Sequence, residues 1–291
     1  MSSPPRVLNA YATDAVAGIQ FTVLQWMTTW YPMGKTSITS RLNIPGRWGW
    51  FTMEVPGFIM LLYIMFTLPG ELGIKSLPAT NWAMAAMFTT HYLYRAILSP
   101  LVLNPSMSPM HPLVWCCALV FQFMNAISIG GWLAGYGPTT ADDWAGRLYI
   151  TEIGMVLWGW GLILNIYHDD QLREIRRSAA RKQRKDAEEK AKAEGTTVEN
   201  IYKKYNVDKV YMIPETGLFR YVLFAHYLSE WLEWLGFWMV GGFGRFTPGR
   251  SFFLNEVFSM SPRAIQGWHW YVRRFGRDKV GNRKAIIPWL I

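Results

Sequence analysis

Long apolar segments recur along the whole chain, and they restrict its fold more than any other feature. Stretches of about 20 mostly apolar residues, the length that crosses roughly 30 Å of hydrocarbon, occur at 13–31, 50–68, 81–103, 112–134, 148–167, 217–240 and 250–272. Backbone groups inside a bilayer must be hydrogen-bonded within the segment, so such segments fold as helices. The sequence therefore predicts an all-α membrane protein, a bundle of about seven transmembrane helices, forming a single polytopic membrane domain over residues 1–291.

The composition supports a membrane location. Of the 291 residues, 51% are hydrophobic and 16% are aromatic, with 16 Trp, which is more large apolar surface than one soluble core can bury. The segment at 250–272 is the least apolar, because it contains Asn255, Glu256, Arg263 and Gln266. We expect it to span the membrane only if it faces other helices or a cavity.

The net charge of +9 is concentrated between spans and at the C-terminal end. This distribution orients a membrane protein and argues against a nucleic-acid partner. Residues 171–209 are rich in Ala, Glu, Lys and Arg and predict a helix that leaves the membrane, then a polar loop from about Gly195. The positive-inside rule places this connection and the C-terminus in the cytosol. The N-terminus lacks the features of a secretory signal, so we expect the first span to direct insertion.

Several polar side chains fall inside the predicted spans, where a charge costs at least a few kcal/mol and is usually functional. Glu54 lies near the start of the second span, and His91, Tyr92 and Arg95 share about one helical face in the third. Two further polar stripes recur at helical spacing, at Asn165, Asp169, Arg173 and Arg176 and at His226, Glu230, Glu233 and Trp234. We infer a polar cavity within the bundle that opens toward the basic side.

Each of these groups also has a structural interpretation. Glu54 could be a hydrogen bonder between helices, Tyr92 an interfacial aromatic, and Trp231 and Trp234 residues of the membrane-surface belt. No metal site is predicted, because the five histidines do not form the clusters that a membrane di-iron enzyme needs. A glycine-rich loop of the G-x-G-x-x-G kind is also missing, so any nucleotide requires a non-Rossmann site.

A series of short motifs follows in a specific order and spacing along the chain. They are "YPMGK" at 31–35, "WFTMEVPGF" at 50–58, "HYLYR" at 91–95, "MNAISIGG" at 124–131, "LNIYHDDQLREIRR" at 164–177, "YMIPETGLFRYV" at 211–222, "EWLEWLGF" at 230–237 and "RKAIIPWLI" at 283–291. Together they resemble the steroid 5α-reductase family of membrane NADPH-dependent reductases. The resemblance covers most of the chain from about Tyr31 onward.

The resemblance implies a multi-pass protein of the endoplasmic reticulum membrane that reduces a carbon–carbon double bond conjugated to a carbonyl. Residues 13–134 would form the substrate-side helices, and residues 148–291 the NADPH-binding half. In that family the residues that match Glu54 and Tyr92 hold the carbonyl oxygen of the substrate. A protonated Glu54 and a phenol can both donate hydrogen bonds to this oxygen as negative charge develops on it. The donor that protonates the α-carbon is not assigned.

The same residue-by-residue match implies positions that bind the cofactor. Arginines among them suit its phosphate groups, because guanidinium groups make forked contacts with phosphate oxygens. The implied cofactor-binding residues are Tyr31, Gly34, Arg95, Asn165, Asp169, Arg176, Tyr211, Tyr221, His226, Glu230, Trp234, Arg263, Tyr271 and Arg283.

The sequence departs from the family pattern at several positions. Met53 stands where a glutamine commonly precedes the glutamate, Met212 where a basic residue often precedes "IP", and His226 where an asparagine is usual. Trp268 replaces a histidine that here comes one position later. The charged segment at about 178–206 is longer than the usual connection, and we interpret it as a lineage-specific cytosolic insert.

The substrate is the least determined part of the prediction. Related reductases act on Δ4-3-oxosteroids, polyprenol-type lipids or trans-2-enoyl-CoA, and the stretches at 50–58 and 91–100 look more like the steroid branch. The N-terminal half offers no phosphate contacts for CoA. We therefore expect a Δ4-3-oxosteroid or a similar enone. The alternatives are an isoprenylcysteine methyltransferase, whose His-Pro-x-Tyr type motif we do not find, and a non-catalytic lipid-binding bundle. The oligomeric state stays open.

Overall fold

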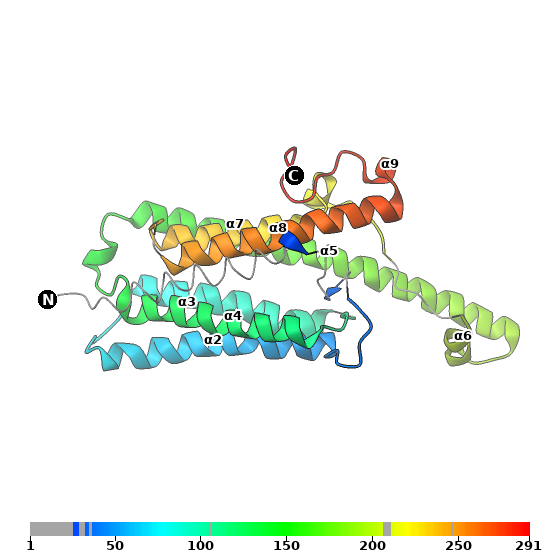
Figure 1. Ribbon diagram of the computed structural model, residues 1–291, viewed down its shortest axis with the longest axis horizontal. Helices are drawn as coiled ribbons and strands as arrows, with labels where there is room; N and C mark the ends of the chain where they lie inside the picture. The colour runs from blue at the N-terminus through cyan, green and yellow to red at the C-terminus, as the bar shows by residue number, and fades with distance from the viewer. Residues whose placement is uncertain (1–25, 29–32, 35–36, 105, 206–210, 246) are drawn as a thin grey trace.

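The computed structural model describes residues 26–28, 33–34, 37–104, 106–205, 211–245 and 247–291. In this part of the chain the structure is all-α, with helices that run along one long axis (Figure 1). The α-helices are α2 Gly46–Glu71, α3 Ala79–Tyr92, α4 Pro112–Gly131, α5 Leu148–Glu194, α6 Val198–Tyr205, α7 Ala225–Val240, α8 Pro248–Phe275 and α9 Arg277–Val280. The predicted all-α fold class is confirmed.

Short helical segments of other types extend or connect these helices. The π-helices η2 Leu93–Leu103 and η3 Trp132–Tyr136 continue α3 and α4 without a break, and the 3₁₀ turns are η4 Asp142–Trp144 and η5 Gly217–Arg220. The predicted spans at 50–68, 81–103, 112–134 and 250–272 fall on α2, on α3 with η2, on α4 with η3, and on α8. The predicted first span, 13–31, lies almost wholly outside the described residues.

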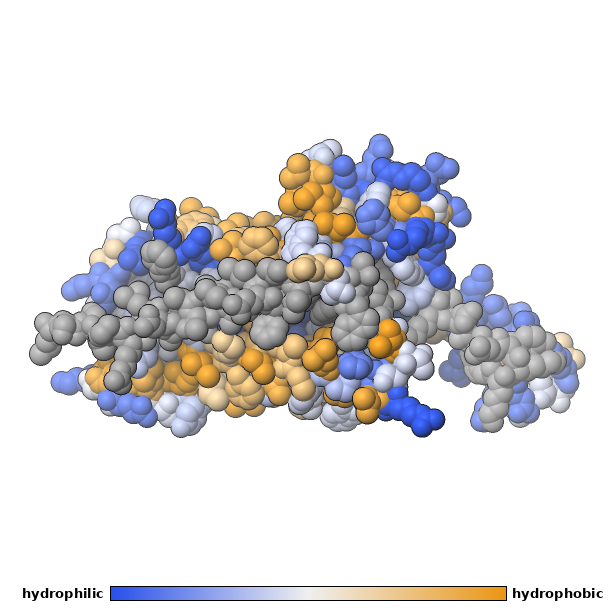
Figure 2. Space-filling model, in the orientation of Figure 1, coloured by the Kyte–Doolittle hydropathy of each residue, from blue (hydrophilic) through white to orange (hydrophobic). Residues whose placement is uncertain are grey.

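Three helices within the described ranges are long and apolar enough to cross a membrane by length and composition: α2, α4 with η3, and α5. Their outer faces expose large apolar side chains, such as Ile59 and Phe66 on α2 and Ile153 and Trp160 on α5. Figure 2 shows hydrophobic side chains along the flanks of the bundle and hydrophilic ones gathered toward its ends. This pattern is that of a bundle surrounded by lipid.

Helix α7 begins later than the predicted span at 217–240. Gly217 takes a left-handed φ of 56° within η5, and the residues before Ala225 pair with the C-terminal segment instead of continuing a helix. The amides of Leu223 and Phe224 donate to the carbonyls of Lys284 and Ala285. These long-range backbone bonds replace the helical ones, so the C-terminal residues dock onto the start of α7.

Helix α5 continues well beyond the predicted span at 148–167. It ends at Glu194, and the next residue, Gly195, has a left-handed φ of 63°. The predicted helix that leaves the membrane and its end near Gly195 agree with the structure, but the predicted polar loop is wrong in part, because α6 follows at Val198. Helix α6 then packs Ile201 against Ala187 and Ala191 near the far end of α5 (Figure 1). The exposed ion pair of Arg184 with Glu188 along this arm adds little stability. The cytosolic location of the insert stays a prediction.

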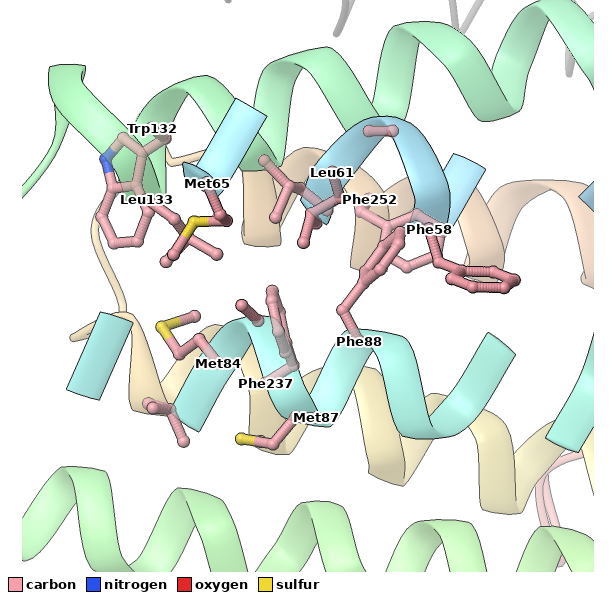
Figure 3. Packing of buried hydrophobic residues seen from close by; sticks show 14 of the residues in the cluster. Phe58, Leu61, Met65, Met84, Met87, Phe88, Trp132, Leu133, Phe237 and Phe252 are labelled. Carbon is pink, nitrogen blue, oxygen red and sulfur yellow. The ribbon is translucent and has the colours of Figure 1, made fainter. Parts of the chain in front are cut away.

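The main apolar core lies between α2, α3, α4, α7 and α8. Figure 3 shows that Leu61, Met65, Phe88 and Phe237 point inward from their helices toward one another. The Phe88 and Phe252 ring centroids are 6.3 Å apart, a spacing at which aromatic pairs attract. This core joins the N-terminal helices to the C-terminal ones.

Helices α5 and α7 approach closely because glycines face the opposite backbone. A Cβ atom on Gly161 would lie 2.3 Å from the backbone nitrogen of Glu233, and one on Gly236 would lie 2.4 Å from that of Trp158. Small residues allow this kind of contact between membrane helices. The close approach holds the acidic residues of α7 directly against α5.

The Gly161→Ala substitution tests this contact. Because the clash is with backbone atoms, we expect α5 and α7 to separate and the free energy of unfolding to fall by about 1–3 kcal/mol. Thermal unfolding in detergent measures the change. Gly159→Ala is the matched control, because a Cβ atom there meets nothing within 4 Å. Equal melting temperatures for the two variants would contradict the close packing.

Candidate functional site

An ionic cluster lies inside the bundle where α3 and η2 face α7. The Nδ1 atom of His91 is 2.7 Å from Oε1 of Glu233, and Nη1 of Arg95 is 3.1 Å from Oε1 of Glu230. His91, Glu230 and Glu233 are buried, with exposed fractions of 2%, 3% and 0%. Charges this deep need partners, because unpaired ions in an apolar interior cost several kcal/mol each.

Arg95 extends the cluster to a third helix. Its Nε atom lies 3.1 Å from Oε1 of Glu54 on α2, so one guanidinium joins carboxyl groups from α2 and α7. The ring of Trp50, one turn before Glu54, lies 5.2 Å from the guanidinium carbon and adds a cation–π contact. The second carboxylate oxygen of Glu54 is buried and has no hydrogen-bond partner among the described residues.

Tyr92 is buried in an aromatic environment next to this cluster. Its ring centroid lies 4.6 Å from that of Phe88 and 6.3 Å from that of Trp234, and its hydroxyl accepts a hydrogen bond of 3.1 Å from Nε2 of Gln122 on α4. Tyr92 lies three residues before Arg95, which contacts Glu54. The structure therefore places Tyr92 and Glu54 inside the bundle, in one neighbourhood, and turns neither toward lipid.

A cavity of about 700 Å³ begins at this cluster and runs along α5. Its lining follows α5 from Leu162 to Gln183, a rise of roughly 30 Å at 1.5 Å per residue. His91, Arg95 and Glu230 line it at the ionic cluster. Further along, residues of α8 close its other wall. The predicted polar cavity inside the bundle is thus present.

Most of the implied cofactor positions lie on this cavity. Those in its lining are Gly34, Arg95, Asn165, Asp169, Arg176, Tyr211, His226, Glu230 and Arg263. Tyr31 lies outside the described residues. Glu54 and Tyr92 are not part of the lining. Each contacts a residue that is: Glu54 contacts Arg95, and the Tyr92 ring centroid lies 5.0 Å from that of His91. Their catalytic role, like the binding role of the lining residues, stays a prediction.

Four implied positions lie elsewhere. Trp234 is buried between His91 and Phe252, with ring centroids 4.6 Å and 4.4 Å away, and Tyr271 stacks on Phe275 at 5.9 Å. Tyr221 is 52% exposed and lies beside Trp289. Arg283 donates from Nε to the carbonyl of Phe219 at 3.0 Å and from Nη1 to two carbonyls near the end of α9. In this structure Arg283 ties the C-terminal segment to η5.

Arg173 belongs to a polar stripe predicted from the sequence, but its polar neighbours on the cavity were not predicted. Nη2 of Arg173 donates to the Tyr94 hydroxyl at 2.6 Å and to Oγ of Ser99 at 3.2 Å, and Asn104 donates to Ser99 in turn. Tyr94, Ser99 and Asn104 are five residues apart, which is the spacing of a π-helix. In an α-helix these residues would lie on different faces, so α-helical spacing in the sequence did not indicate that they lie together.

Charged groups line the cavity along its length. Glu230 and Arg95 lie at the ionic cluster, while Arg176, Arg263 and Arg273 contribute cations further along. Arg176 is exposed, and no ion pair holds it among the residues that the structure describes, whereas its neighbours Arg173 and Arg177 pair with Asp170. Arg176 is therefore available for an anionic ligand. Within the described ranges, no group of three or more His, Cys, Asp or Glu residues is placed to hold a metal ion.

Comparison with known proteins gives consistent matches. Residues 195–291, which contain α6 to α9, match the sequence model of a family described as 3-oxo-5-alpha-steroid 4-dehydrogenase. The chain is 36% identical over 275 residues to uncharacterized protein C9.08c of Schizosaccharomyces pombe, covering 89% of this chain and 91% of that protein. It is 29% identical over 272 residues to steroid 5-alpha-reductase DET2 of Solanum lycopersicum, covering 93% and 91%. It is also 29% identical over 266 residues to 3-oxo-5-alpha-steroid 4-dehydrogenase 1 of Homo sapiens, covering 88% and 85%.

The His91→Phe substitution tests how much the ionic cluster depends on its partners. Glu233 Oε2 already lacks a partner among the described residues, so this variant leaves a buried carboxyl group with neither oxygen paired. We expect the free energy of unfolding in detergent to fall by about 3–5 kcal/mol. Thr89→Val is the control on the same helix, because the buried Thr89 hydroxyl has no hydrogen-bond partner in the described structure. A loss of similar size in Thr89→Val would contradict this explanation.

Proposed function

Because this chain belongs to the steroid 5-alpha-reductase family and is an oxidoreductase of the 3-oxo-5-alpha-steroid 4-dehydrogenase type, we propose that it reduces a Δ4-3-oxosteroid with NADPH. The reaction saturates the carbon–carbon double bond and yields the 5α-reduced 3-oxosteroid. One observation carries the proposal: Arg95 joins Glu54 to Glu230 at the inner end of the long cavity. The Arg95 guanidinium therefore contacts Glu54, the proposed carbonyl-binding acid, and also lines the cavity that is large enough for a nucleotide.

The cavity fits a dinucleotide phosphate in length and in charge. A lining of roughly 30 Å along α5 accommodates an extended ligand, and the exposed guanidinium of Arg176 suits phosphate oxygens. Arg263 and Arg273 add two cations on the opposite wall. At the inner end, Asn165 and Glu230 offer an amide and a carboxylate for polar groups of a ring. When bound, NADPH supplies the hydride.

Glu54 and Tyr92 then act on the carbonyl of the steroid. Oε1 of Glu54 accepts from Arg95, so a proton carried on Oε2 faces away from the guanidinium and is free to donate. The Tyr92 hydroxyl accepts from Gln122 and retains its own proton to donate. Two donors on the oxygen that becomes an enolate lower the barrier, since each such donor is worth about 100- to 1,000-fold in rate.

The apolar surroundings strengthen this electrostatic effect. Phe88 and Trp234 pack near the Tyr92 ring, and Tyr92 is 2% exposed. In a site without water, a hydrogen bond to a developing charge is worth far more than in solution. A lipophilic substrate also partitions from the bilayer into such surroundings without losing contact with apolar groups.

We further propose that the protein is a multi-pass protein of the endoplasmic reticulum membrane with a cytosolic C-terminus. The basic arm of α5 and the C-terminal segment lie toward the same end of the bundle (Figure 1), and hydrophilic side chains gather there in Figure 2. Positive residues on one side are retained in the cytosol. In this orientation a cytosolic cofactor would enter the cavity from the side of the basic residues.

Glu54→Gln and Tyr92→Phe test the proposed reaction. In detergent with NADPH and a Δ4-3-oxosteroid, we expect the wild type to consume nicotinamide and enone absorbance together. Each variant should lower kcat by about 100- to 1,000-fold and leave the Kd for NADPH unchanged, because neither side chain lines the cavity. Tyr63→Phe is the control for the loss of a phenol, since Tyr63 is 63% exposed on the outer face of α2.

Other outcomes of that assay separate the alternatives. If the protein reduces a trans-2-enoyl-CoA or a polyprenol-type enone but no steroid, the assignment as a reductase holds and the assignment of a steroid substrate is wrong. Failure to bind NADPH at all would instead favour a lipid-binding bundle without catalysis.

Arg176→Gln tests the cofactor end of the cavity. Loss of a charge-assisted contact with phosphate should raise the Kd for NADPH by roughly 10- to 100-fold, measured by nicotinamide fluorescence. With saturating NADPH, kcat should stay near the wild-type value. Arg184→Gln removes the same group further along α5, outside the cavity lining, and should bind NADPH normally. Equal weakening by both substitutions would point to a diffuse charge effect instead.

A further inference from the structure

Gln122 is a buried amide on a helix that is otherwise mostly apolar. It lies in α4, is 5% exposed, and reaches across the bundle to Tyr92 with its Nε2 atom 3.1 Å from the hydroxyl oxygen. Burial of an amide is unfavourable unless its groups are hydrogen-bonded. The contact with Tyr92 satisfies the nitrogen end, while Oε1 has no hydrogen-bond partner among the described residues.

The opposite helix leaves a gap for this amide. A Cβ atom on Gly57 of α2 would lie 2.7 Å from Oε1 of Gln122 and 3.4 Å from its Cβ and Cδ atoms, so only glycine at this position accommodates the side chain as it stands. Gly57 comes three residues after Glu54, and both are buried on α2. The Gln122 amide therefore fills the space between the Tyr92 hydroxyl and the face of α2 that bears Glu54.

The direction of the hydrogen bond has a consequence for the phenol. A tyrosine hydroxyl has one proton and two acceptor lone pairs, and an amide nitrogen can only donate. Gln122 Nε2 therefore occupies a lone pair of Tyr92 and cannot take the proton of the hydroxyl. The orientation of the O–H bond is restricted, and its proton stays available for another acceptor.

We propose that Gln122 is a positioning residue that holds the Tyr92 hydroxyl with its proton directed at the ketone oxygen of the steroid. This inference rests on the proposed function, in which Tyr92 donates to that oxygen. Gln122 contacts the phenol and acts on the substrate only through it. If the hydrogen bond between α4 and α3 were purely structural, it would stabilise the fold. Its loss would then affect the binding of a 3-oxosteroid and of a steroid without the 3-oxo group equally.

Binding to the oxidised complex separates these two roles, because no reduction occurs there. The full-length protein in detergent is saturated with NADP⁺, and the Kd is measured for progesterone, a Δ4-3-oxosteroid, and for the analogue that lacks the 3-oxo group. We expect Gln122→Met to weaken progesterone binding by roughly 3- to 10-fold, the range of one hydrogen bond, and to leave binding of the 3-deoxy analogue unchanged. With NADPH, kcat for progesterone should fall while the Kd for NADPH does not change.

A double-mutant cycle shows whether Gln122 acts through Tyr92. In the Tyr92→Phe background, Gln122→Met should weaken progesterone binding no further, because the group that it positions is already missing. Gln122→Glu should weaken binding at least as much as Gln122→Met, because a carboxyl oxygen in place of the amide nitrogen can accept the Tyr92 proton and turn it away from the ketone. Ser128→Ala is the control on α4, since no hydrogen bond to Tyr92 involves Ser128 in the described structure.

Gly57→Ala provides a second test that does not alter Gln122 itself. Its methyl group would displace the Oε1 end of a flexible side chain, and alanine is a better helix former than glycine, so we expect a folded protein with a re-aimed amide. It should reproduce the progesterone-specific loss, and adding Gln122→Met should not increase that loss.

The outcomes separate this inference from the proposed function. Three results would overturn the positioning role of Gln122: equal weakening of binding for both steroids, effects that add to those of Tyr92→Phe, or wild-type binding by both Gln122→Met and Gly57→Ala. None of these results would contradict the proposed role of Tyr92 as a donor to the ketone. If the wild type neither binds nor reduces progesterone, the assignment of the substrate fails, and the role of Gln122 fails with it.

Discussion

One guanidinium fixes the relation between the two halves of the bundle. Arg95 contacts the carboxyl groups of Glu54 on α2 and Glu230 on α7, each at 3.1 Å, and buried polar groups are destabilising without a partner. The three helical segments that carry these groups therefore have little freedom to shift against one another. Because Glu54 belongs to the proposed carbonyl site and Glu230 to the cavity, the contacts of Arg95 that stabilise the fold would also set the distance between substrate and cofactor.

The irregular parts of the backbone support this arrangement. The π-helix Leu93–Leu103 brings Tyr94 and Ser99 to one side, where both bind Arg173 of α5, while Arg95 turns toward Glu54 and Glu230. An α-helix of the same residues would not present both sets of contacts. The glycine contacts of Gly161 with α7 in turn hold α5 close to Glu230. Backbone geometry thus aligns the long wall of the cavity with the ionic cluster at its inner end.

Helix identity and the main polar face could be predicted from the sequence, because both depend on local spacing. Apolar length gave α2, α4 and α8, and helical spacing grouped His91 with Arg95. The late start of α7 could not be predicted, because Leu223 and Phe224 pair with residues some sixty positions away. The five-residue spacing in η2 was hidden by the assumption of an α-helix. The contact that Arg283 makes with Phe219 depends on where the C-terminal segment docks, which no motif encodes.

The surroundings of Glu54 and Tyr92 show how one polar group can be supplied from different helices. The residue before Glu54 is Met53, which packs with Met33 and Met110 in an apolar cluster and offers no amide to the site. The amide in this neighbourhood comes from Gln122 on α4 and contacts Tyr92 instead. Because a buried amide with an unpaired oxygen is destabilising, packing alone does not favour it over a methionine of similar size. The proposed positioning of the phenol gives the amide a role, since the orientation of a single proton matters for donation to a ketone and hardly at all for stability.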